Sequence, residues 1–329
     1  MMTENGKGGL SEAILENLPA LAGPARTGAL KAFSQLLGGA GSYIAAWLRR
    51  PTQAVDDKTD AKSLITKRIA EAAADVAASD PEVIAAAIEK WLPSELRRQE
   101  NKKKIVLETV RELETGDYIS GESSHEEIDE DWLNVFERFS ENASSDRMQG
   151  LWARVLSGEI VRPGSFSRST LRFLYELDKR TAECFEKICP FILGEQIFVT
   201  KGNDGLFVDL LHLETSGILT GATGLLGWSA TADDKGVFAL GGEKQGILVK
   251  TAPGEKITLD AIPLTQIGIE ISRIVPNPDE EKRLRAMSEI LRTKNVQGVA
   301  LAWVVGKNGN MRTYKLNRQL WGEAVFDNT

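Results

Sequence analysis

A glycine-rich run, Thr220 to Gly227 (TGATGLLG), has the spacing with the most specific chemical meaning in this chain. It resembles the glycine fingerprint with which dinucleotide-binding folds hold a pyrophosphate, and that chemistry needs a preceding strand and a following helix. The residues that follow, Trp228 to Thr231, favour a strand instead, and Asp233 to Gly236 favour a turn. We therefore expect a glycine-rich β-turn and not a nucleotide site.

Histidine and carboxylate residues do not form a catalytic pattern in this sequence. His125 has no second histidine four residues later, which a helical zinc-protease motif requires. Asp129, Glu130 and Asp131 are consecutive and point in different directions, so an acidic helix start explains them. His212 falls in an apolar helix and is expected to be a satisfied core or surface histidine.

The two cysteines are predicted to be structural. Cys184 and Cys189 are five residues apart in a predicted helix, which puts them on different faces. We expect two reduced core thiols and no disulfide between them. No third cysteine and only two histidines are present, so we do not expect a zinc site built from Cys and His. The sequence thus predicts no metal, no cofactor and no enzymatic activity.

Composition and charge set the class of protein. The 329 residues are 42% hydrophobic and 26% charged, which is ordinary for two or three globular domains. Because the formal net charge is −7, nucleic acid would have to bind through a local basic patch. Residues 1–9 lack the order of a secretory signal peptide, so we expect a cytoplasmic protein that can lie peripherally at the inner membrane.

Residues 1–50 form a predicted helical segment of small and apolar residues. Ala32 to Trp47 carries no charge, but these sixteen residues are short against the about 20 that a membrane span needs. The segment is either a packed helical hairpin bent at its glycines or an element that lies in a membrane interface. The predicted membrane or oligomer contacts are Phe33, Leu36, Leu37, Tyr43, Ile44, Trp47, Arg49 and Arg50.

Residues 51–116 comprise a polar linker followed by alanine-rich helices. Pro93 is expected to break or kink one of these helices, with Ser94 capping the next. That next helix begins with a basic cluster, formed by Arg97, Arg98, Lys102, Lys103 and Lys104. The cluster is either a solvated helix face or a contact surface for an anionic partner, nucleic acid or lipid.

Residues 117–194 are predicted to form a compact bundle of short helices, each apolar on one side. Ser144 or Ser145 would cap the helix that contains Trp152, and Gly158 would end that helix. These helices make the predicted fold class mainly α.

A smaller α+β part is predicted to follow the bundle. Residues 195–275 show the order helix, glycine turn, β-hairpin and helix, which favours a winged-helix-like segment. Residues 276–329 favour a charged helix and a final β-hairpin. The chain is therefore expected to combine a helical N-terminal region, a helical bundle and a C-terminal α+β part.

Several short motifs occur together in a characteristic order. They are RRQEN at 97–101, DWL at 131–133, LWARVLSGE at 151–159, PGS at 163–165, and Leu264-Thr265 with Gly268. Through them the segment 97–275 resembles an uncharacterised bacterial family, catalogued as a domain of unknown function (number 2806). The resemblance implies a helical core and supplies no catalytic residue. For the LWARVLSGE motif we expect a structural role, with Trp152 in the core and Glu159 or Arg154 pairing across the turn.

Two functional hypotheses follow. The first is a non-enzymatic, self-associating bacterial protein that binds or senses a partner through its C-terminal part and contacts a membrane through its N-terminus. A phage-defence or toxin-like effector is its most concrete version, and the partner would be a membrane surface, a protein or a phage component. The alternative is a nucleic-acid-binding protein that uses the winged-helix-like segment and the basic cluster at 97–104.

Overall fold

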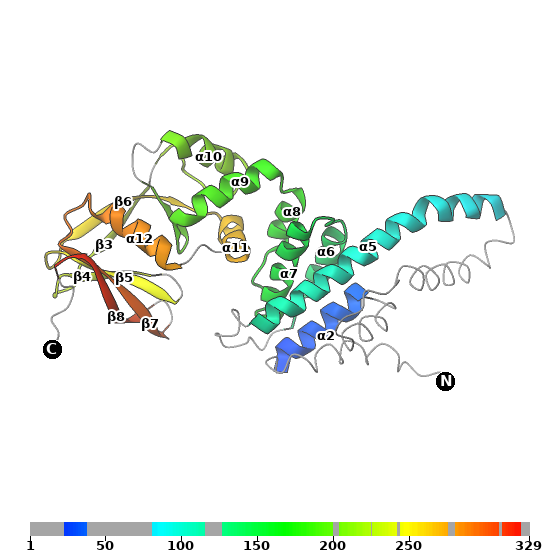
Figure 1. The fold of residues 1–329 in the computed structure, drawn as a ribbon, viewed down its shortest axis with the longest axis horizontal. Helices are drawn as coiled ribbons and strands as arrows, with labels where there is room; N and C mark the ends of the chain where they lie inside the picture. Colours follow the sequence, from blue (N-terminus) through cyan, green and yellow to red (C-terminus); the bar gives the residue numbers. More distant parts are fainter. Residues whose placement is uncertain are drawn as a thin grey trace. The chain divides into compact units, whose positions relative to one another are not determined.

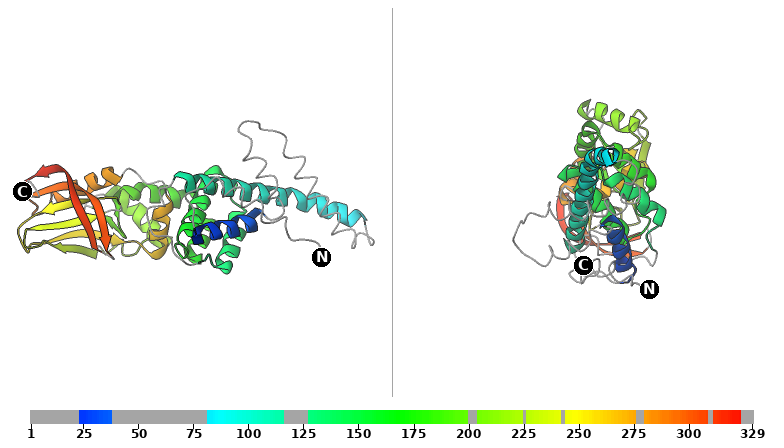
Figure 2. Two further views of the ribbon diagram at one scale, coloured as in Figure 1. Left: turned by 90° about the horizontal axis from the view of Figure 1, so that it is seen from below. Right: turned by 90° about the vertical axis from the view of Figure 1, so that its right-hand side faces the viewer.

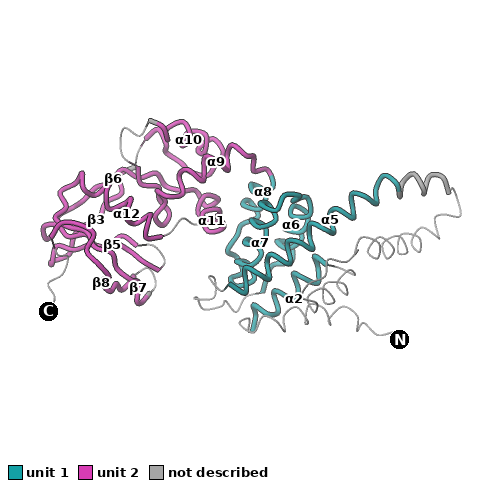
Figure 3. The backbone as a smooth tube through the Cα atoms, in the orientation of Figure 1, with its two compact units in different colours: residues 1–175 teal, residues 176–329 magenta. Residues whose placement is uncertain are grey.

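The structure of the chain, a computed structural model, describes most of the residues after position 80 and one helix before it (Figure 1). The described ranges are 23–37, 81–115, 127–199, 204–224, 226–241, 244–275, 280–308 and 311–323. The chain divides into two compact units, Met1–Tyr175 and Glu176–Thr329, which are coloured separately in Figure 3. We call them unit 1 and unit 2.

Unit 1 is helical. Its described helices are α2 (Gly23–Leu37), α5 (Pro81–Thr115), α6 (Glu130–Ser140), α7 (Asp146–Val161) and α8 (Arg168–Glu176). The long helix α5 packs against α7, α2 and α6, and Figure 2 shows α2 running alongside it. Trp152, Phe136 and Phe33 are among the largest fully buried side chains. The rings of Phe136 and Trp152 meet edge to face at 5.3 Å, so α6 and α7 share one aromatic core.

Helix α5 continues through Pro93, so of the two predicted outcomes, a break or a kink, the break is wrong. Ser94 does not cap a new helix, because its hydroxyl donates to the carbonyl of Trp91 at 2.7 Å. Pro93 and Trp91 are exposed, whereas Ile105 and Val106 further along are fully buried. The missing backbone hydrogen bond therefore faces solvent, while packing against α7 holds the second half of the helix.

Local hydrogen bonds start the next two helices as predicted. Asp129 accepts from the backbone N–H of Trp132 at 2.7 Å, and Ser145 accepts from Met148 at 3.3 Å. The predicted stop at Gly158 is wrong, because α7 runs on to Val161. Gly158 is required inside the helix, since a Cβ atom there would lie 2.7 Å from the ring of Phe166.

Unit 2 contains the other described helices and all the described strands. Its helical elements are α9 (Lys179–Ile188), η2 (Cys189–Phe191), α10 (Asp204–Thr215), α11 (Gln266–Ile274) and α12 (Glu280–Leu291). Its strands are β1 (Ile192–Leu193), β2 (Gln196–Phe198), β3 (Leu226–Thr231), β4 (Val237–Gly241), β5 (Gln245–Lys250), β6 (Lys256–Pro263), β7 (Gly298–Asn308) and β8 (Met311–Gly322). They form two antiparallel sheets, ordered β1-β2-β6-β3 and β4-β5-β7-β8.

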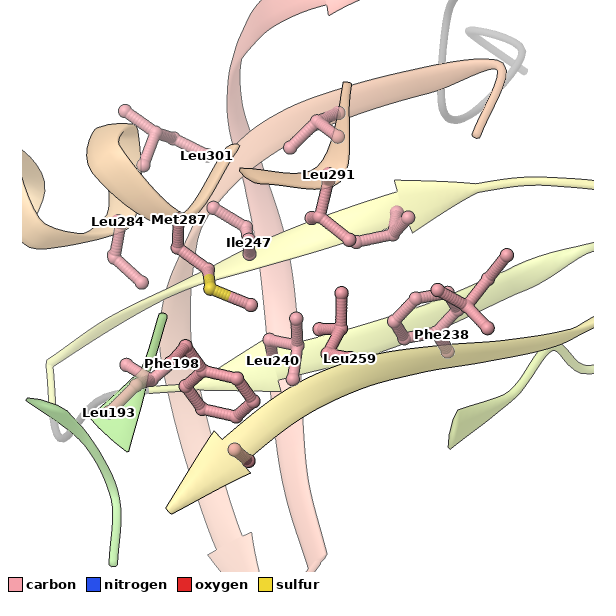
Figure 4. Packing of buried hydrophobic residues seen from close by; sticks show 14 of the residues in the cluster. Leu193, Phe198, Phe238, Leu240, Ile247, Leu259, Leu284, Met287, Leu291 and Leu301 are labelled. Atoms are coloured by element: carbon pink, nitrogen blue, oxygen red, sulfur yellow. The ribbon is translucent and has the colours of Figure 1, made fainter. Parts of the chain in front are cut away.

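One hydrophobic core joins both sheets and α12. Figure 4 shows Met287 and Leu291 of α12 beside Ile247 of β5, with Leu259 of β6 on the other side of the cluster. Strand β4 alternates, so that Phe238 and Leu240 face this core while its other residues face away. Each sheet therefore covers the apolar face of the other, and α12 completes the cover.

The expected winged-helix-like arrangement of residues 195–275 is not what these strands form. Strands β3 and β6 belong to one sheet, whereas β4 and β5 belong to the other and need β7 to cover the edge of β5. Strand β6, which pairs with both β2 and β3, was not predicted at all. The fold class is nevertheless confirmed, because the chain is mainly helical with a C-terminal α+β part and the final β-hairpin is present.

Candidate binding surface

The N-terminal contact residues fall into two groups. Phe33, Leu36 and Leu37 are at most 4% exposed, because α2 packs them against α5 and α7. The prediction that these three residues contact a membrane or a second copy is therefore wrong, because they lie in the core of unit 1. Tyr43, Ile44, Trp47, Arg49 and Arg50 lie outside the described residues. Among the helices that the structure describes, none combines the length and the apolar character needed to cross a membrane.

The basic cluster of α5 is engaged in ion pairs within unit 1. The Lys102 ammonium lies 2.9 Å from Oε1 of Glu137, and its side chain is only 7% exposed. Arg98 lies 2.6 Å from Glu95 and 3.5 Å from Glu141.

The remaining cations of the cluster do not restore a common surface. Lys104 lies 3.9 Å from Asp146, Lys103 also has an interaction partner, and Arg97 is exposed. Lys102 is buried between helices. Neither predicted alternative, a solvated helix face or a contact surface for an anionic partner, therefore describes the whole cluster.

The LWARVLSGE motif has a structural role. The carboxylate of Glu159 is 1% exposed and accepts hydrogen bonds from the backbone N–H groups of Gly164 at 2.7 Å and Phe166 at 3.1 Å. The indole of Trp132 donates to the carbonyl of Phe166 at 2.6 Å. Arg154 pairs with Glu112 of α5 at 3.0 Å. These contacts fix the turn after α7 and join the helices, so the motif is explained without a ligand.

The glycine run forms the predicted turn and not a phosphate cradle. Gly224 donates its backbone N–H to the carbonyl of Gly221 at 3.2 Å, and strand β3 starts two residues later. The carboxylate of Glu214 accepts from the N–H groups of Gly221 at 2.5 Å and Ala222 at 3.3 Å. The chain's own carboxylate therefore holds the amides that a phosphate would need.

Polar contacts between α9 and α10 account for His212 and Cys184. His212 Nε2 lies 2.9 Å from the hydroxyl of Thr181, so the expected satisfied histidine is confirmed. Cys184 donates its thiol to Asp209 at 3.2 Å, and Lys187 pairs with the same carboxylate at 2.9 Å.

Both cysteines are free and buried, as predicted. Burial, and then the hydrogen bond to Asp209, raises the pKa of the Cys184 thiol. Burial raises the pKa of Cys189 to about 12. Neither thiol therefore has the depressed pKa of a reactive cysteine.

Strands β4, β5, β7 and β8 carry an unusual set of charges. Every charged residue in them is a cation: Lys250, Lys307, Arg312, Lys315 and Arg318. The chain as a whole has a formal net charge of −7. This sheet therefore concentrates positive charge that the average composition hides.

Part of the β7–β8 hairpin extends past the neighbouring strand β5. Trp303 is the last residue of β7 that pairs with β5, opposite Gln245. We call residues 303–308 and 311–316 the β7–β8 arm. Its exposed large apolar side chains are Trp303 at 45%, Val305 at 57% and Leu316 at 36% exposure. Exposed apolar and cationic side chains thus lie together on one β-ribbon.

The register of the arm aligns two of its cations with the tryptophan. Lys315 lies directly opposite Trp303, and Arg318 lies opposite Leu301. Because the register shifts between Leu301 and Ala302, β8 holds one extra residue there, Asn317. Lys315 and Arg318 therefore share a face of the ribbon although they are three residues apart.

One face of the arm packs on the sheet, from Tyr314 in its middle to Arg312 near its end. The guanidinium of Arg312 donates to the carbonyl of Gly241 at 3.0 Å. The Tyr314 ring lies so close to Gly246 that a Cβ atom at that glycine would be 2.6 Å from it. Tyr314 also packs on Leu248 and Ala302. These contacts give the arm a fixed direction.

Acidic groups of α12 adjoin the same region. Glu280 accepts from the backbone N–H groups of Lys244 and Gln245, both at 3.2 Å. Glu281 pairs with Arg285 at 2.9 Å and also with Arg318. These hydrogen bonds, that from Arg285 foremost, lower the pKa of Glu281. Since Glu281 partly offsets Arg318, exposed Lys315 is the cation most available beside Trp303.

This surface was missed in the sequence, although a signal for it was present. From Lys307 to Trp321 the chain carries four cations and no carboxylate, interleaved with aromatic and aliphatic residues. What the sequence lacks is the pairing that places Trp303 and Lys315 side by side.

The chain thus combines an all-helical unit 1 with an α+β unit 2 that contains two antiparallel sheets. Residues 87–197 match the model of the family described as Protein of unknown function (DUF2806), which confirms the resemblance seen in the sequence. The match runs from within α5 into β2, and thus ends well before residue 275, where we expected it to end. No curated protein and no solved structure matches the chain.

Proposed function

We propose that this chain is a non-enzymatic binding protein that holds nucleic acid, a polyanionic partner, on the β7–β8 arm of unit 2. The observation that carries the proposal is the arm itself, which has cations, exposed apolar side chains and no carboxylate in a chain of negative net charge. An acidic protein needs such a local basic patch to approach a phosphate backbone.

Electrostatics support a polyanion over a second copy of the chain. Lys315 and Arg318 lie on one face of β8, the face that carries Trp303, whereas Arg312 lies on the other face. The positive potential of this face therefore comes from Lys315 and Arg318. A second copy docked on the same face would bring like charges together, whereas a phosphate backbone would neutralise them.

The basic cluster of α5 is a weaker candidate for nucleic-acid binding than the arm, because its cations form ion pairs within unit 1. Lys102 and Arg98 of α5 are paired with carboxylates of unit 1. The arm, by contrast, has exposed Lys315 beside a half-exposed indole. The nucleic-acid alternative therefore moves from the 97–104 cluster and the winged-helix-like segment to the arm.

Several sequence-based expectations stay predictions. They are self-association, a peripheral membrane contact of residues 1–50, a cytoplasmic location and a phage-defence or toxin-like role. Only α2 of the N-terminal segment is described, and its apolar side chains are packed within unit 1. Fractionation of the full-length protein with anionic vesicles, beside a variant that lacks residues 1–50, tests the membrane contact.

The proposal is tested by fluorescence anisotropy of a labelled oligothymidylate of about 20 nucleotides with the full-length protein. Binding should weaken as salt is raised from about 50 to 300 mM. Lys315→Gln should weaken binding several-fold and reduce the slope of log K against log salt by about 0.7. Lys256→Gln, which removes an exposed strand lysine from the other sheet, is the matched control and should bind like the unmodified protein. Absence of binding at the lowest salt would contradict the proposal.

A further inference from the structure

We infer that the arm selects single-stranded nucleic acid, because Trp303 offers its indole to an unpaired base while Lys315 meets the adjoining phosphate. This inference rests on the proposed function and names the class of nucleic acid that the same surface takes. Trp303 lies just beyond Leu301, the last residue of β7 in the core that the two sheets share.

Trp303 continues a buried row of β7 into solvent. Val299 and Leu301, which precede it at two-residue intervals, are fully buried in the core shared by the sheets. Trp303 has the same orientation along the strand, yet 45% of it is exposed. An indole on a sheet whose core ends beneath it leaves part of its ring surface available to a ligand.

Unpaired bases are the ligands that match a half-exposed indole beside cations. A base stacks on an aromatic side chain through its π-face, and nearby cations hold its phosphates. Lys315 lies opposite Trp303 on the neighbouring strand, and the extra residue Asn317 brings Arg318 to the same side. One aromatic ring and two cations therefore line a single face of the ribbon.

Duplex nucleic acid cannot make all the contacts that this surface offers. In a duplex the π-faces are stacked on neighbouring base pairs, so Trp303 would remain against water or phosphate. Val305, at 57% exposure, would likewise gain no apolar contact from a phosphate backbone. The cations alone would still attract a duplex through its charge, but more weakly than a strand that also stacks.

The experiment compares one oligonucleotide as a single strand and as a blunt duplex, by anisotropy at the same salt with full-length protein. The single strand should bind about tenfold more tightly. Trp303→Ala should reduce single-strand affinity about tenfold and leave duplex affinity nearly unchanged, whereas Trp303→Phe, which retains a ring, should keep most of it. Val305→Ala is the matched control, since it removes an exposed apolar side chain from the same arm without removing a ring.

The outcomes separate this inference from the proposed function. Equal affinity for single strand and duplex, or a folded Trp303→Ala variant that binds the single strand like the unmodified protein, overturns single-strand selection but leaves nucleic-acid binding in place. If Trp303→Ala fails to fold, a Trp303→Phe variant that weakens single-strand binding as much as Lys315→Gln does overturns the stacking role. If the protein binds neither the single strand nor the duplex at low salt but binds vesicles of phosphatidylserine and phosphatidylcholine, both proposals are overturned in favour of a membrane surface.

Discussion

Lys102 and Glu137 form an ion pair of 2.9 Å that joins α5 to α6 across the core of unit 1. Glu137 also accepts a hydrogen bond from Gln35 of α2 at 3.0 Å, so one carboxylate connects three helices. The pair uses a lysine that the sequence assigned to the surface. Its burial makes the charge of Lys102 dependent on Glu137, because an unpaired buried ammonium is costly.

Removal of the Glu137 carboxylate is expected to destabilise the protein. Glu137→Leu leaves Lys102 without its partner and should lower the free energy of unfolding by about 2 kcal/mol, since Glu137 is partly exposed. Urea unfolding followed by circular dichroism measures this change. Arg111→Gln removes an exposed ion pair with Glu108 on α5, the helix of Lys102, and should lower the free energy of unfolding by less than about 0.5 kcal/mol. Equal effects of the two substitutions would contradict a buried pair.

A methyl group at position 158 is expected to disturb the turn after α7. Gly158→Ala places its Cβ 2.7 Å from the Phe166 ring and should lower the free energy of unfolding by about 1–3 kcal/mol. Gly150→Ala lies in the same helix and meets nothing within 4 Å, so it should stabilise the helix by up to about 1 kcal/mol. Opposite signs in urea unfolding are expected, and a stabilising Gly158→Ala would show that the contact is absent.

The N-cap of α9 is expected to make stability depend on acid. A hydrogen bond from the backbone N–H of Thr181 lowers the pKa of Asp178 below its usual 3.8. The cap therefore contributes fully above the ordinary pKa, and its contribution is lost as pH falls through the lower folded value. Asp178→Asn retains the cap without the titration. Between about pH 5 and pH 2.5 the unmodified protein should lose more stability in urea unfolding than this variant; identical pH profiles would refute the assignment.

The cysteines are expected to be inert in the folded protein. Burial raises the pKa of Cys189 to about 12, and burial with the Asp209 contact raises that of Cys184. Because the thiolate is the reactive form, a disulfide reagent at about pH 8 should label neither residue in the native state. Both should react in urea, giving two labels per chain by mass spectrometry. Rapid labelling of the native protein would show that a thiol is accessible.

The elements predicted well are those fixed by neighbouring residues. The caps Asp129 and Ser145 satisfy backbone groups three residues away, so their role can be read from the sequence. Pro93 and Gly158 misled the prediction because contacts with distant residues decided the outcome. A helix held along its second half tolerates an exposed proline, and a glycine pressed against Phe166 belongs inside a helix.

The candidate surface depends on pairing that composition cannot supply. The cations of β8 are visible in the sequence, but the alignment of Lys315 with Arg318 depends on one extra residue in the strand. The basic cluster of α5 was equally visible, yet Lys102 lies in the core because Glu137 is opposite it in space. The order of the strands could not be predicted for the same reason, because β5 pairs with β7, which follows it by nearly fifty residues.

The late arrival of β7 has a consequence for synthesis of the protein. Ile247 and Val249 reach the ribosome exit well before their partners Leu301 and Val299. Until then β5 keeps one edge without a partner and part of its apolar face without cover, which is the state most prone to misassembly. A stop codon that falls before Gly298 should therefore yield insoluble chains that cellular quality control removes, and not a shortened protein with a working helical unit.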